Sequence, residues 1–274
     1  MEDIFTFKIK EKEAKDFFLY SYFGIVTEDF SIGNKSVQAD TRESAAVKCA
    51  YRAYLDLCRT LTYKTEEESS KGAFVKDICT RLAEALCTDE EFPVRRKNAY
   101  EVFYSKDGSL EKALAQHLDI DDCNDEEKRH SKCFYFGQAQ KWINMTVKYM
   151  WLIGIIGEAD EESFDAPIDS IVMQAAGSDF LLRFPRNNKT YNNAFDDQDA
   201  NAFELWKEYS PNASMPWSKL EEPEYERIQS CIRSNTNNKP LYWECSAWIA
   251  QSALDEINKN DWRFTSNKKE SGEL

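Results

Sequence analysis

A lysine and an aspartate are the side chains in this sequence best suited to chemistry. Lys141 lies within a segment of helical periodicity, and Asp169 completes a Pro-Ile-Asp turn just before the next predicted helix. An unprotonated amine is a nucleophile, and a carboxylate beside it can accept the proton that the amine must lose. The two residues therefore predict amine chemistry, provided that the fold brings them together.

The helix that carries the lysine is predicted to run from Phe134 to about Ile155. At about 100° per residue, its apolar side chains fall on one face, and Lys141, Asn144 and Lys148 fall on the opposite face. The polar face has two interpretations, and both stay open. It is a stripe of lysines that faces solvent, or it forms one wall of a site. Asp169 also has two interpretations: it is the N-cap of the next helix, or it is the partner of the lysine.

The same stretch resembles helix-hairpin-helix DNA glycosylases. Gly137-x-Ala139-x-Lys141-x-x-Asn144 is similar to the Gly-x-Gly-x-Lys-x-x-Asn segment that leads from hairpin to helix in the endonuclease III type. The run from Gln140-Lys141 to Val147-Lys148, followed by Pro167-Ile168-Asp169, resembles the archaeal 8-oxoguanine DNA glycosylases more closely. Trp217-Ser218-Lys219 is also similar to a box in uncharacterised bacterial helical proteins, to which no activity attaches.

The glycosylase resemblance implies a specific reaction. Lys141 would attack C1′ of a damaged or modified nucleoside, expel the base and form a Schiff base, and Asp169 would deprotonate the amine and stabilise positive charge on the sugar. The base would be flipped out of the helix and held by an aromatic ring, for which Trp142, Trp151 and Trp217 are available.

The resemblance also implies which residues contact DNA. These are Gly137, Gln140, Asn144 and Lys148. Three departures from the family pattern are visible: Ala139 replaces the second hairpin glycine, no four-cysteine cluster for an iron–sulfur centre is present, and the acidic run Glu158–Asp165 would repel a DNA backbone. No cofactor is expected.

The charge balance supports a competing interpretation. The chain of 274 residues has a net charge of −14, which argues against a protein that coats nucleic acid without specificity. It suits an acidic, non-catalytic protein that binds a basic partner or mimics DNA. A descendant of the glycosylase fold that has lost its activity is a third possibility.

Cysteine and histidine usage predicts neither disulfides nor a metal site. The eight cysteines form no C-x-x-C motif, and the chain has two histidines. Free thiols in a reducing compartment are the simpler interpretation. The sequence has no run of 18 apolar residues and no signal peptide, so we expect a cytoplasmic protein without a membrane partner.

Periodicity predicts an all-α, multi-helix domain with a small β element near the N-terminus. The resemblance implies that its fold is similar to that of the helix-hairpin-helix glycosylases. The expected division is a mixed segment at 1–39, a helical domain at 40–260 and a flexible tail at 261–274. The Asn187–Asp199 loop is either a substrate loop or disordered. Helices are expected at about 41–61, 75–86, 93–103, 109–118, 134–155, after 169, and at 200–209, 222–233 and 241–257.

Overall fold

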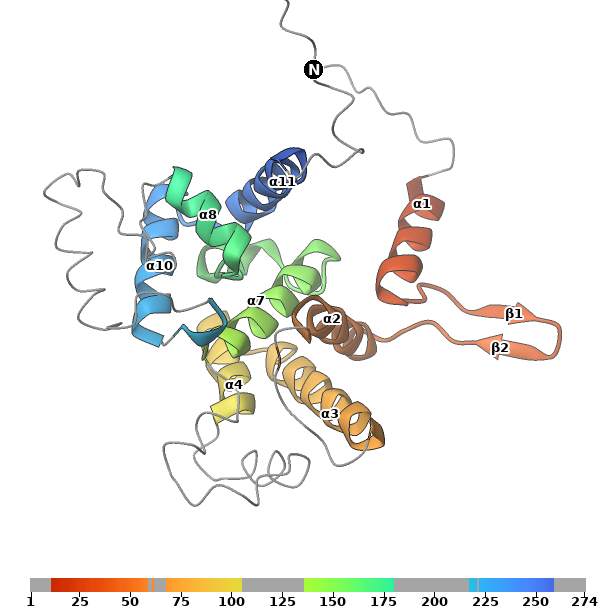
Figure 1. Cartoon of the computed structure of the whole chain (residues 1–274). Coiled ribbons are helices and arrows are strands. Elements are labelled where there is room, and N and C mark those ends of the chain that lie inside the picture. Colours follow the sequence, from red (N-terminus) through yellow and green to blue (C-terminus); the bar gives the residue numbers. More distant parts are fainter. Residues whose placement is uncertain are drawn as a thin grey trace, which may run out of the picture. The chain divides into compact units, whose positions relative to one another are not determined.

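The computed structural model describes residues 11–58, 61, 68–104, 136–179, 217–220 and 222–258 (Figure 1). These residues are mostly helical, which confirms the all-α class. The sheet found among them is a two-stranded antiparallel hairpin in which β1 (Phe30–Ile32) pairs with β2 (Lys35–Val37). The strand expected at Phe5, Phe7 and Ile9 lies outside the described residues.

The chain divides into two compact units. The first comprises Met1–Cys133 and Met145–Glu158, and the second comprises Phe134–Asn144 and Ala159–Leu274. Helix α7 (Phe136–Leu152) therefore contributes its first part to the second unit and its last part to the first.

The first unit contains the hairpin and the helices before α7. Its α2 and α3 lie side by side, and α3 also packs on α4 (Figure 1). The apolar faces predicted for these helices are buried, as at Ala46, Leu57 and Ile78. The helical elements are α1 (Glu11–Phe18), a π-helical turn (Leu19–Phe23), α2 (Arg42–Leu57), α3 (Glu68–Leu86) and α4 (Phe92–Tyr104).

Two helix ends differ from the expected positions. They are the start of α3, in a polar stretch, and the end of α7, near a glycine. Helix α3 spans Glu68–Leu86, and so includes residues before the expected start at 75. Helix α7 ends at Leu152, because Gly154 adopts a left-handed conformation with φ of 80° and the Ile155 N–H donates to the Met150 carbonyl at 2.8 Å. This is a Schellman-type helix end, which glycine favours.

The start of α2 is held by two neighbouring side chains, Asp40 and Thr41. Thr41 is the N-cap, and its hydroxyl accepts a hydrogen bond from the Ser44 N–H at 3.2 Å. The neighbouring Asp40 carboxylate accepts from the Val26 N–H at 2.7 Å, from the Ser44 hydroxyl at 2.8 Å and from Lys48 at 2.5 Å. Asp40 thus ties the chain before the hairpin to the first turns of α2.

Replacing Asp40 with asparagine should lower stability at neutral pH and weaken its acid dependence. Burial by itself raises the pKa of Asp40, but hydrogen bonds from Lys48, the Val26 N–H and Ser44 outweigh it, so the pKa lies below its ordinary value. Such a group stabilises the fold above its unfolded pKa, and this contribution is lost as the pH falls through the folded pKa. We expect a loss of about 1–2 kcal/mol at pH 7.

Urea unfolding at several pH values between neutral and acidic measures this effect. The control is Asp77→Asn, because Asp77 is exposed and its ion pair with Arg81 is long, at 4.0 Å. Equal acid dependence in the Asp40 variant and the unmodified chain would contradict the assignment.

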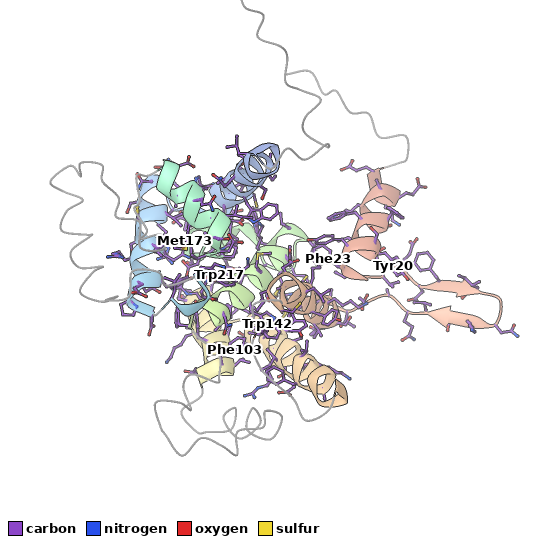
Figure 2. The ribbon with its side chains drawn as sticks, in the orientation of Figure 1. Tyr20, Phe23, Phe103, Trp142, Met173 and Trp217 are labelled. Carbon is purple, nitrogen blue, oxygen red and sulfur yellow. The ribbon has the colours of Figure 1, made fainter. Side chains whose placement is uncertain are left out.

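The second unit is built around one apolar cluster. It joins the chain before α8 to one face of α10, and Phe136, Met173, Trp217 and Trp243 pack against it (Figure 2). Its elements are the first part of α7, a 3-10 turn (Glu158–Ser163), α8 (Ser170–Asp179), a 3-10 turn (Trp217–Lys219), α10 (Glu222–Asn235) and α11 (Pro240–Asn258). The buried members of the cluster are Ala166, Ile168, Val172, Leu220, Tyr225, Ile228 and Ile232.

The helices expected at 109–118 and 200–209 and the Asn187–Asp199 loop lie outside the described residues. In the part of the chain that the structure covers, no helix is long and apolar enough to cross a membrane. The six cysteines in that part are free thiols, as expected, and Cys49 and Cys79 are buried.

Candidate active site

Lys141 and Asp169, both in the second unit, form a buried ion pair. The Lys141 Nζ lies 2.6 Å from the Asp169 Oδ2, and the two side chains are 9% and 10% exposed. Of the two interpretations of this helix face, the solvent-facing stripe does not hold for Lys141, which is buried. Residues from the turn before α8 and from α10 contact this face of α7, and a periodicity count along one helix cannot detect such neighbours.

Asp169 combines the two roles that its sequence position allowed. Its Oδ1 accepts hydrogen bonds from the Ile171 and Val172 N–H groups, both at 2.9 Å, so it caps α8. Its Oδ2 faces Lys141. Because the cap uses one oxygen and the lysine uses the other, the carboxylate is held in one orientation and lies at the positive end of a helix.

Two glutamines hold the segment that leads into Asp169. Gln140 on α7 accepts from the Ile168 N–H at 3.1 Å and donates to the Ile168 carbonyl at 2.7 Å. Gln229 on α10 does the same for Ala166, at 3.1 Å and 2.6 Å. Each amide satisfies both backbone groups of one residue on either side of Pro167, so the turn is fixed without a strand partner.

A second buried chain of hydrogen bonds runs from α7 to α10. The Asn144 amide donates to the Tyr225 hydroxyl at 2.8 Å, and that hydroxyl donates to Asp165 at 2.8 Å. Arg233 pairs with the other oxygen of Asp165. Asp165 is one of the acidic residues expected to repel DNA, and its charge is balanced internally.

Trp217 covers the lysine. The Lys141 Nζ lies 4.9 Å from the centre of the Trp217 ring, which is cation–π distance, and the tryptophan is half-buried. Of the two other tryptophans considered, Trp142 is fully buried and Trp151 is half-buried in the part of α7 that belongs to the first unit.

Gly137 sets the distance between α7 and the turn that carries Trp217. A Cβ on Gly137 would lie 2.0 Å from the Trp217 carbonyl oxygen and 2.9 Å from the Leu220 nitrogen. The Gly137 N–H also donates to the Leu220 carbonyl at 2.9 Å. Because α7 begins at Phe136, Gly137 and Ala139 lie in its first turn and not in a hairpin loop before it.

The DNA contacts expected of four residues stay predictions. Gly137, Gln140 and Asn144 are buried with partners inside the protein. Lys148 is half-buried and lies in the part of α7 that belongs to the first unit. In the structure, Gln140 and Asn144 lie close to the Lys141–Asp169 pair, and their hydrogen bonds hold residues that surround it.

Sequence reasoning missed three residues of this site. Gln229, Tyr225 and Arg233 all lie on α10, where spacing alone marks a helix face without showing what it meets. Among the described residues, no group of three histidine, cysteine or acidic side chains is placed to hold a metal ion. No known protein family, curated protein or solved structure that was compared with this chain matches it.

Proposed function

We propose that this protein is a DNA base-excision enzyme in which Lys141 forms a Schiff base with the deoxyribose of a damaged or modified nucleotide. The observation that carries the proposal is the buried 2.6 Å contact between Lys141 and Asp169, with the carboxylate fixed by the α8 cap. The likeness to the helix-hairpin-helix glycosylase fold is part of the same proposal.

The geometry suits the proton transfers of that reaction. Asp169 accepts a proton from the Lys141 ammonium, and the freed amine attacks C1′ as the glycosidic bond breaks and its electron pair leaves with the base. The leaving base takes a proton from the newly bonded nitrogen, and Asp169 returns its own proton to O4′ as the C1′–O4′ bond opens, which leaves the Schiff base. Trp217 would offer a ring face to the flipped base, since it is the tryptophan in contact with the Lys141 amine.

Reductive trapping tests the proposal. The full chain is incubated with an oligonucleotide containing an abasic site, or 8-oxoguanine, and borohydride is added. An imine between Lys141 and C1′ would be reduced to a stable amine, and the covalent adduct would be visible on a denaturing gel. We expect an adduct with the unmodified chain and none with Lys141→Ala.

Lys97→Ala is the matched control, because Lys97 is an exposed lysine that meets Glu101 at 3.8 Å. Its adduct yield should equal that of the unmodified chain. Equal adduct formation by the Lys141 and Lys97 variants would assign the reaction to surface lysines and remove the proposal.

A second candidate is a non-catalytic acidic protein that binds a basic partner. Two observations favour it. The net charge is −14, and the Lys141–Asp169 pair is largely buried, as purely structural ion pairs also are. In that case no adduct forms, and the chain binds a basic protein with an affinity that falls as salt rises.

A further inference from the structure

A groove in the first unit separates parts of α2 and α3. It has a volume of about 550 Å³, which lies within the range of small-molecule sites. Its lining residues are Val47, Lys48, Tyr51, Tyr54, Gly72, Val75, Lys76 and Cys79. None of them takes part in the proposed reaction.

The lining is aromatic and apolar at its centre. The Tyr51 and Tyr54 rings are stacked with their centres 6.1 Å apart and their planes 28° apart. Val75 is buried beside them, and burial raises the pKa of the Cys79 thiol to about 12, so this thiol is neutral and contributes an uncharged surface. A flat ring is the shape that such a surface accommodates best.

Gly72 lines the groove, is exposed and contributes no side chain. A Cβ on Gly72 would have no heavy atom within 4 Å. A larger side chain at this position would therefore occupy space that is empty in the structure.

The charges of the lining are all positive, in a chain whose net charge is −14. Lys48 is already bound to Asp40 and to the Gly24 carbonyl. Lys76 is exposed, and its amine has no hydrogen-bond or ion-pair partner among the described residues. An anionic group placed in the groove would thus find one available cation.

We propose that this groove binds a small planar apolar molecule with one negative charge, of which an aromatic carboxylate is the simplest example. The ring lies against Tyr51 and Tyr54, and the carboxylate pairs with Lys76. The site is independent of the proposed DNA reaction, since it uses no residue of the Lys141–Asp169 pair.

Titration of the full chain with naphthoate, followed by ligand-observed NMR, tests the proposal. Binding should be saturable, about tenfold weaker in Tyr51→Ala, and blocked in Gly72→Leu. Lys76→Gln should weaken it roughly three- to tenfold, while Lys35→Gln, which removes an exposed positive charge elsewhere in the first unit, should not. Circular dichroism checks that each variant is folded.

The neutral analogue naphthylmethanol separates the two contributions. Its affinity should be the same in the unmodified chain and in Lys76→Gln, because it carries no charge for the lysine to pair with. The proposal is overturned if naphthoate shows no saturable binding, if Gly72→Leu binds it unchanged, or if Lys35→Gln weakens it as much as Lys76→Gln.

Discussion

Replacing Asp169 with asparagine should slow adduct formation on an abasic oligonucleotide by about 10²–10⁴-fold, the usual contribution of a positioned general base. Asparagine is as good an N-cap as aspartate, so the bonds from the Ile171 and Val172 N–H groups can persist. What the variant loses is the charged oxygen that lies 2.6 Å from Lys141. The rate is measured under single-turnover conditions.

A stability measurement separates this chemical effect from a structural one. Asp169→Asn leaves the buried Lys141 ammonium without its counter-ion, and we expect a loss of about 3–5 kcal/mol. Adding Lys141→Met should recover much of that loss, because both charges are then absent, while adduct formation is abolished because the amine is gone. Full trapping activity in Asp169→Asn would show that the carboxylate serves only the cap and the ion pair.

Gly137→Ala should be among the most destabilising single substitutions in the second unit. The new Cβ would lie 2.0 Å from the Trp217 carbonyl oxygen and 2.9 Å from the Ser218 carbonyl carbon. Both atoms belong to the backbone, so the turn itself must move, and this movement also strains the Gly137 hydrogen bond to Leu220. We expect a loss of about 2–4 kcal/mol, in the upper range for overpacking.

Gly72→Ala is the matched control for Gly137→Ala. Both glycines are helical, but a Cβ on Gly72 meets nothing within 4 Å. Alanine at that position should stabilise the chain by about 0.5–1 kcal/mol, because glycine is a poor helix residue. Urea unfolding measures both variants, and a Gly137→Ala chain as stable as the unmodified one would mean that the turn is not packed on α7 as described.

Moving the turn should also affect Trp217 and therefore Lys141. Tryptophan fluorescence is expected to change in Gly137→Ala and not in Gly72→Ala. If the DNA reaction is confirmed, the Gly137 variant should also form the Lys141 adduct more slowly, because the ring that covers the amine is displaced.

Local patterns were enough to predict most of the longer helices of the described residues, from α2 onward, and most of their buried faces. The spacing of Ala46, Cys49 and Leu57 marks one face of α2, and residue type limits its N-cap to Asp40 or Thr41, of which the structure shows Thr41. Such features depend on residues within one or two turns, so a single sequence contains them. The hairpin at 30–37 and helix α1 were missed, because their strands and turns are short and largely exposed.

The sequence by itself singled out Lys141 and Asp169 and assigned each to the right kind of local structure, a helix face and a helix start. It could not determine that the two meet, or that Gln140, Gln229 and Tyr225 surround them. Those contacts join residues that lie 28 or more positions apart in the sequence. Only the tertiary structure decides which polar face is covered, because burial depends on what packs against a helix and not on the helix alone.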